Sequence, residues 1–346
     1  MPVKREELTP RAWGALLWLV TLAPAAELFP AVGLEAGRGA WLNPAAAGLL
    51  ILPLLWMTRR GEGIRLGEHP IGRWIALVCG LWMELLLVLR LTLCARRLLW
   101  SGERDGAVWF FLLTLTALAL WMVGGKLSAL GRAGQIYLVL LLGVAVLVLG
   151  LSLPRVRVDR ILPLWTEDAG AVLLSGLRGA GSLCWGLLPM LFLSVRPGSG
   201  KSRILWGGGG CLLLTLAQLI IIGNLGVGLC ARSESAFFVL TKSVGVEGGF
   251  QRVESVVAAL WMISDLMLTV ILARAVGICA QQVCPKLKYE GTTSFILLAG
   301  AGAALWGTRW GAAVSNWNLE WVWMGNLVSC FMVCLGTFLV KRTKTT

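Results

Sequence analysis

The chain has few charged residues for its length. Asp, Glu, Lys and Arg make up 14% of its 346 residues, whereas a soluble domain carries about 25%. Hydrophobic residues make up 57%, and the mean hydropathy is +0.78. This composition excludes an ordinary soluble domain and predicts a polytopic membrane protein. The net charge of +13 therefore does not indicate a nucleic-acid partner, because its meaning depends on where the basic residues lie.

The chain also lacks the clusters of residues that hold metals or perform catalysis. His69 is the single histidine, and the nine cysteines are scattered without a CxxC pair. A zinc site needs neighbouring Cys and His ligands, so we expect no metal site and no disulfide framework, only buried free cysteines. No nucleophile–base motif is visible, so we expect neither an enzyme nor a cofactor. The segment Pro197–Ser202 is similar to the end of a phosphate-binding loop, but Val195 stands where that loop requires glycine.

Long apolar runs predict ten membrane-spanning helices, since a helix needs about 20 apolar residues to cross a bilayer. We place the spans at residues 12–34, 41–58, 72–95, 107–125, 134–153, 170–195, 204–230, 251–281, 293–308 and 318–340. If all ten cross, placing the N-terminus in the cytoplasm puts more Lys and Arg residues in cytoplasmic segments than in outer ones. This bias predicts that both termini are cytoplasmic. No small-residue cleavage site follows the first span, so we interpret it as a retained helix and not as a signal peptide.

We expect residues 1–346 to form a single integral membrane domain. Ten spans divide into five plus five of opposite orientation, which predicts an inverted repeat with a first half at 12–153 and a second at 170–340. The first span of each half is interrupted, by Pro24 in span 1 and by a glycine-rich segment before Pro189 in span 6. Proline and glycine both open helices. The predicted fold is therefore an all-α transporter fold with discontinuous helices 1 and 6.

The interruption in span 1 is a candidate binding site. Ala23 and Pro24 would supply opened backbone, and Glu27 would supply a carboxylate for an ammonium group or a proton. The alternative is that Glu27 is a neutral carboxyl group hydrogen-bonded to a neighbouring helix.

The interruption in span 6 offers a complementary site. The N–H groups of Gly179, Gly181 and Ser182 would hold a substrate carboxylate at the start of a half-helix, and Trp185 would cover the ligand. The alternative is that these small residues serve close helix packing.

Further ionisable residues lie in spans 3 and 8. Glu254, Trp261 and Asp265 follow the helical period and share one face of span 8, which must look into the bundle. We interpret Asp265 as a candidate for the ligand site or a proton relay. Glu84, Arg252 and Glu254, together with Trp261, are expected in structural or coupling roles. The other basic residues within spans are expected to reach the lipid headgroups by snorkelling: Arg90, Arg178 and Arg274.

Several segments resemble the spore germination permease family, a branch of the amino acid–polyamine–organocation transporters. The most specific match is Phe250-x-Arg252-x-Glu254 followed by Trp261, which resembles the family's opening of span 8. Ala36-Gly37-x-x-Ala40-Trp41-Leu42 and Leu162-Pro163 also fit. The chain differs from the family where Ala23 stands near its usual glycine, where Gly39 replaces an acid, and where Glu27 replaces an apolar residue.

The resemblance implies the membrane subunit of a germinant receptor in the spore inner membrane. Such a subunit would bind a small nutrient such as an amino acid, act with an A subunit and a lipoprotein C subunit, and trigger germination. One alternative is a secondary transporter of amino acids, coupled to protons through Glu27 or Asp265. Another is a scaffold whose pocket has lost its function.

Overall fold

The computed structural model describes residues 7–32, 34–58, 66–67, 69–100, 108–162, 169–196, 200–233, 235–243, 253–307 and 312–342. Within these ranges, the side chains at 27–35, 96–100, 169, 253–254, 312–320 and 339–342 are outside the description. The described residues are helical apart from turns and one isolated β-bridge between Leu8 and Val195.

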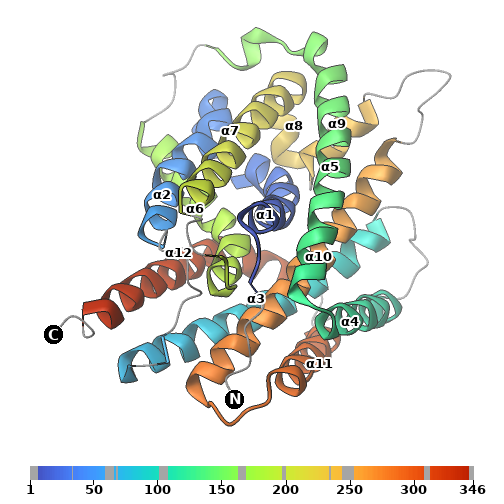
Figure 1. The fold of residues 1–346 in the computed structure, drawn as a ribbon. Coiled ribbons are helices and arrows are strands. Elements are labelled where there is room, and N and C mark those ends of the chain that lie inside the picture. Colours follow the sequence, from blue (N-terminus) through green and yellow to red (C-terminus); the bar gives the residue numbers. More distant parts are fainter. Residues whose placement is uncertain are drawn as a thin grey trace.

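Ten long helices make up most of the described chain (Figure 1). They are α1 (Pro10–Val32), α2 (Asn43–Met57), α3 (Pro70–Trp100), α4 (Val108–Gly124), α5 (Leu127–Ser152), α6 (Ala169–Phe192), α7 (Gly200–Leu225), α10 (Val253–Val283), α11 (Tyr289–Gly307) and α12 (Ala312–Arg342). The short helices are η1 (Leu34–Leu42), η2 (Leu153–Arg155), η3 (Val158–Arg160), α8 (Val227–Arg232) and α9 (Ala236–Ser243). Each long helix overlaps one predicted span, so the ten-helix prediction is confirmed.

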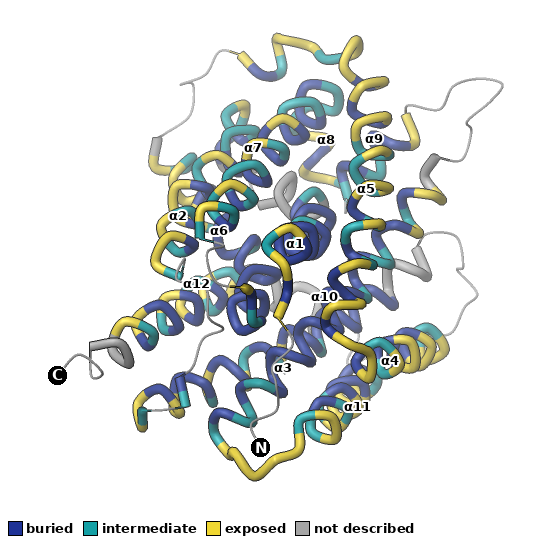
Figure 2. Tube along the Cα trace, in the orientation of Figure 1, coloured by how far each residue is buried: buried dark blue, intermediate teal, exposed yellow. Residues whose placement is uncertain are grey.

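The outer surface of this bundle is apolar. By length and composition, seven of the described helices could cross a membrane, and the shorter apolar helix Val108–Gly124 adds to them. Large apolar side chains stand on the outside, including Trp121 at 80% and Phe295 at 71% exposure. Figure 2 shows α4, α5 and α11 with exposed outer faces, while α1 in the middle is mostly buried. A surface of this kind faces lipid, so the chain is an integral membrane protein.

Helices 1 and 6 are continuous, and the predicted discontinuity is wrong. α1 runs unbroken from Pro10 to Val32 through Pro24, and α6 runs through Pro189. Pro24 removes only the N–H that would bond to the carbonyl of Val20. A Cβ atom added at Gly186 of α6 would lie 2.8 Å from that carbonyl oxygen, so α6 packs directly against the site of the missing bond. Neighbouring helices tolerate proline in a membrane span in this way.

Gly186 and Gly181 of α6 serve close packing with α1 and α12, respectively. A Cβ atom at Gly181 would collide with the backbone carbonyl of Trp323 in α12. The carbonyl of Gly181 accepts a hydrogen bond of 2.9 Å from Nδ2 of Asn326, whose Oδ1 accepts one of 2.9 Å from the indole of Trp82 in α3. The packing interpretation is therefore confirmed for Gly181, because its N–H belongs to an unbroken helix.

Candidate functional site

A buried ion pair joins α3 to α10 near the middle of the bundle. The guanidinium of Arg90 contacts the carboxylate of Asp265, and the two side chains are 2% and 1% exposed. Arg90 lies 10 residues before the end of α3, and Asp265 lies 12 residues after the start of α10. Of the described helix pairs, α3 and α10 have the most extensive contact. The pair therefore sits well inside both helices.

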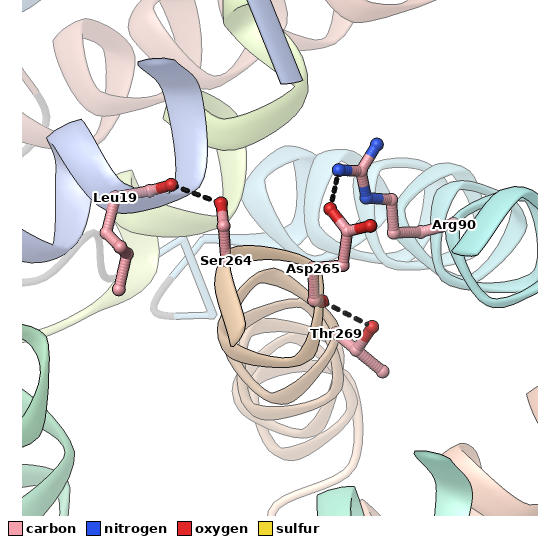
Figure 3. A network of polar contacts seen from close by, with 5 residues as sticks. All are labelled: Leu19, Arg90, Ser264, Asp265 and Thr269. Carbon is pink, nitrogen blue, oxygen red and sulfur yellow. Dashed lines mark hydrogen bonds and ion pairs between the residues drawn. The ribbon is translucent and has the colours of Figure 1, made fainter. Parts of the chain in front are cut away.

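Helices α1 and α6 border the same pair. The guanidinium carbon of Arg90 lies 6.0 Å from the ring centre of Trp185 in α6. The hydroxyl of Ser264, adjacent to Asp265, donates a hydrogen bond to the carbonyl of Leu19 in α1. One turn deeper, the hydroxyl of Thr269 donates to the backbone carbonyl of Asp265 at 2.8 Å. Figure 3 shows the Ser264–Leu19, Arg90–Asp265 and Thr269–Asp265 contacts around α10. We call Leu19, Arg90, Trp185, Ser264, Asp265 and Thr269 the central polar network.

Two buried donors of this network lack an acceptor among the described residues, namely Nε of Arg90 and Nε1 of Trp185. Burying an ion costs several kcal/mol, and a partner must offset that cost. A buried donor without an acceptor costs about 1–3 kcal/mol more. The network therefore has spare hydrogen-bonding capacity at a place where unsatisfied polar groups are expensive.

The chemistry of this arrangement fits a zwitterion. One cationic and one anionic side chain face each other, so together they are neutral. The carboxylate of a zwitterionic ligand can replace Asp265 as the partner of Arg90. The ammonium group of the same ligand can replace Arg90 as the partner of Asp265. No buried charge is then left unpaired, because each protein group exchanges one opposite charge for another. A ligand with a single charge would replace only one of these two opposite charges.

The structure brings only part of the predicted site together. Trp185 and Asp265 both belong to the central polar network. The hydroxyl of Ser182 donates to the carbonyl of Arg178 at 2.9 Å, and Gly179 is buried inside α6. The predicted cradle of free N–H groups from Gly179 to Ser182 is therefore wrong, because these residues are part of a continuous helix.

Other predicted residues lie elsewhere or outside the described part of the structure. Pro24 is buried within α1. Glu27 and Glu254 lie in α1 and α10, and their side chains are not among those described; Arg252 is outside the described residues entirely. Glu84 of α3 is partly exposed, and its Oε2 atom is buried without a partner among the described residues. A Cβ atom at Gly300 of α11 would lie 3.0 Å from its Oε1 atom.

Ala23 and Trp261 line a second, apolar pocket. Its walls come from α1, α5, α7, α9 and α10, and it contains about 670 Å³ of space not filled by atoms, part of it open to the outside. Trp261 is 3% exposed, stacks on Phe238 and meets Phe237 edge-on, with both ring-centre distances at 5.0 Å. We call this pocket the α5–α7 groove, because those two helices form its outer walls.

The sequence analysis missed the role of Arg90. We expected Arg90 and Arg274 to snorkel to headgroups, but both are buried, at 1% and 5% exposure. Nη2 of Arg274 donates to the carbonyl of Val123, at 3.0 Å, and to that of Gly125 at the C-terminal end of α4. A signal for the ion pair was present. Under the expected topology, Arg90 and Asp265 carry opposite charges and both lie in the outer halves of their spans, and intramembrane charges tend to pair.

No protein-family model matches this sequence, and a search of curated proteins finds no match. Solved structures do match. The crystal structure of MhsT in complex with L-phenylalanine has a TM-score of 0.67 and 14% identity, covering 95% of this chain and 89% of that one. A sodium-coupled sialic acid symporter in an outward-open state has a TM-score of 0.64 and 10% identity, covering 96% and 79%.

A manganese transporter mutant from Eremococcus coleocola has a TM-score of 0.57 and 13% identity, covering 94% of this chain and 76% of that one. These three similarities establish the fold alone, which is the LeuT-type fold. The predicted transporter architecture is confirmed at this level.

Proposed function

We propose that the protein is the membrane-embedded subunit of a spore germinant receptor, and that it binds an amino acid at the Arg90–Asp265 pair. The buried pair carries the proposal, because it is a neutral site of two opposite charges inside a transporter fold. The resemblance of the Phe250–Trp261 segment to germination permeases supports the receptor role. The spore inner membrane is the location that this role requires.

The proposed binding step is an exchange of partners. The ligand carboxylate takes the guanidinium of Arg90, and the ligand ammonium takes the carboxylate of Asp265. Nε of Arg90 and Nε1 of Trp185 have no acceptor among the described residues, so they offer additional hydrogen bonds to the ligand carboxylate. A charge-assisted, two-point contact of this kind is among the stronger interactions available to a small ligand.

The exchange would change how the four helices are held together. In the present arrangement, the ion pair ties α3 to α10, and the Ser264–Leu19 hydrogen bond ties α10 to α1. A ligand that replaces the ion pair favours a different spacing of α3 and α10. It shifts the population only because it binds that arrangement more tightly. In the receptor, the A subunit and the lipoprotein C subunit would read this shift.

A panel of amino acids and their singly charged analogues tests the binding step. We expect at least one amino acid to raise the melting temperature of the purified protein, because a ligand that binds the native state stabilises it. Its methyl ester and its deaminated acid should give no shift at the same concentration. The double variant Arg90→Gln/Asp265→Asn should lose the response. A response of the double variant equal to that of the wild type would show that the ligand binds elsewhere.

The partner role has its own test. Affinity purification from dormant spores should recover an A subunit and a lipoprotein C subunit with the tagged chain. Spores lacking the chain should fail to germinate with the amino acid identified above, and should still respond to other triggers. Normal germination without the chain would contradict the receptor role while leaving amino acid binding intact.

The second candidate function is a proton-coupled secondary transporter of amino acids. It is favoured by the similarity to a structure solved with L-phenylalanine. Glu27 or Asp265 would carry the proton. Reconstituted protein would then accumulate the amino acid along a pH gradient, and Glu27→Gln would reduce that uptake at equal protein abundance. Binding without uptake favours the receptor, whereas absence of both favours a scaffold that has lost its pocket.

A further inference from the structure

The α5–α7 groove is distinct from the central polar network. α1 and α10 contribute to both, but none of the groove's lining residues comes from α3 or α6. On α10, Val257, Trp261 and Ser264 follow the helical period and share one face. Val257 and Trp261 line the groove, while Ser264 contacts Leu19 one turn deeper. The groove therefore lies directly along α10 from the network, toward the N-terminal end of that helix.

The groove opens to the lipid-facing side of the bundle. Val146 of α5 lines it and is 64% exposed. The adjacent outer surfaces of α5 and α7 carry exposed Leu147 and Leu216. The back wall is formed by Leu22 and Ala23 of α1, which are 6% and 4% exposed. A molecule that enters from the bilayer would therefore pass between α5 and α7 and reach α1. Lipid that stays on the outer surface of the bundle does not contact this part of α1.

The lining is chemically suited to hydrocarbon. The side chains that form it are aliphatic or aromatic, and the single polar side-chain atom among them is the indole nitrogen of Trp261. That N–H has no acceptor among the described residues.

We propose that the α5–α7 groove binds one acyl chain of a bilayer phospholipid. The argument is continuity, because the apolar outer surface of α5 extends without a polar barrier through Val146 into the groove. The bilayer also supplies acyl chains at high concentration to any apolar opening on this surface. A chain seated there contacts α1, α5, α7 and α10 at once, and so favours the arrangement in which α1 rests against α10. This proposal does not depend on the nature of the small ligand.

Photo-crosslinking in bilayers tests the proposal. The full-length protein is reconstituted in phosphatidylcholine vesicles that contain a phosphatidylcholine with a diazirine near the end of one acyl chain. After irradiation, mass spectrometry locates the labelled peptides. We expect label on the buried Leu22–Ala26 segment of α1 as well as on the outer faces of α5 and α7. The equally buried stretch Leu268–Ala273 of α10, which does not line the groove, should remain unlabelled.

Two alanine-to-phenylalanine variants make the comparison specific. Ala145→Phe places a ring in the groove from α5, and should reduce the α1 label at least fivefold without changing the label on outer faces. Ala117→Phe adds the same ring on the exposed surface of α4 and should leave the α1 label unchanged. The wild-type pattern decides the question even if Ala145→Phe misfolds. Absence of label on α1 in the wild type overturns the proposal, as does an α1 label that a folded Ala145→Phe variant retains in full.

Discussion

Asp265 and Trp261 lie one turn apart on α10, yet their surroundings differ in kind. Asp265 contacts a buried guanidinium, and its neighbour Ser264 donates to the backbone of α1. Trp261 lies among aromatic and aliphatic side chains, and its N–H has no described acceptor. In the central polar network each charge needs an opposite charge, so a ligand must replace a specific group. In the α5–α7 groove, shape and apolar area decide what binds.

The largest effect is expected from separating the central charges. Arg90→Ala leaves the carboxylate of Asp265 in the bundle without the guanidinium, which costs about 3–5 kcal/mol. The double variant Arg90→Leu/Asp265→Leu removes both charges and should recover most of this loss. Thermal unfolding of the purified variants in one detergent measures the difference. If the double variant is as unstable as Arg90→Ala, the pair contributes to stability through packing and not through charge.

The next effect concerns the contact of α1 with α6. Gly186→Ala places a methyl group 2.7 Å from Cγ2 of Thr21 and 2.8 Å from the carbonyl oxygen of Val20, so the two helices must separate. Overpacking of this kind costs about 1–3 kcal/mol. Gly143→Ala on α5, where nothing lies within 4 Å of the added atom, should instead stabilise the helix by about 0.5–1 kcal/mol. Equal melting temperatures for the two variants would contradict the close contact.

A smaller effect separates two buried tryptophans. The indole of Trp13 donates to the carbonyl of Met190 at 3.1 Å, whereas the indole of Trp261 has no described acceptor. Trp13→Phe and Trp261→Phe remove a similar buried apolar area, but only Trp13→Phe also removes a hydrogen bond. It should therefore be less stable than Trp261→Phe by about 1 kcal/mol. The reverse order would indicate that the N–H of Trp261 donates to an acceptor outside the described residues.

The smallest effect on stability, but a sharp chemical contrast, is expected among the cysteines. Cys284 is exposed after α10, and the other eight are buried. The thiolate is the reactive form, and burial raises the pKa of Cys230 in α8 to about 11. At pH 7.5 a charged maleimide should therefore label Cys284 and spare Cys230. Cys284→Ser should remove the signal.

The same reagent tests the predicted orientation of the chain. With cytoplasmic termini, Cys284 follows the eighth span on the cytoplasmic side. It should react in inside-out vesicles and be protected in intact cells. Labelling of intact cells would reverse the topology while leaving the fold unchanged.

The long helices were predictable from the sequence because the bilayer imposes a length and an apolar composition on each span. The span expected at 251–281 became Val253–Val283, and that at 170–195 became Ala169–Phe192. The interruptions were not predictable, because Pro24 and the glycines of α6 signal either an opened helix or a close contact. α6 packs closely there because Gly186 contacts the backbone of α1, and this contact joins segments far apart in sequence.

The candidate site was predicted in part. Asp265 was correctly expected to face into the bundle, because a carboxylate in a span cannot face lipid. Trp185 was expected to cover a ligand, and it lies beside Arg90, the partner of Asp265. Arg90 was assigned to the headgroups because its long side chain can snorkel, and only the position of α3 beside α10 shows that it pairs inward. Ala23 and Trp261 were expected in a ligand or coupling role, and the structure places both in an apolar groove.

The sequence by itself determined that this is a helical membrane protein with ten long helices, since hydrophobic length is a local property that needs no knowledge of neighbours. Only the tertiary structure decided that α1 and α6 stay continuous, that Arg90 meets Asp265, and that a groove opens between α5 and α7. Each of these depends on which helix faces move next to each other. In lipid, an unpaired charge or an unbonded backbone group is costly. The local structure therefore depends on which neighbouring helix supplies the opposite charge or the hydrogen bond.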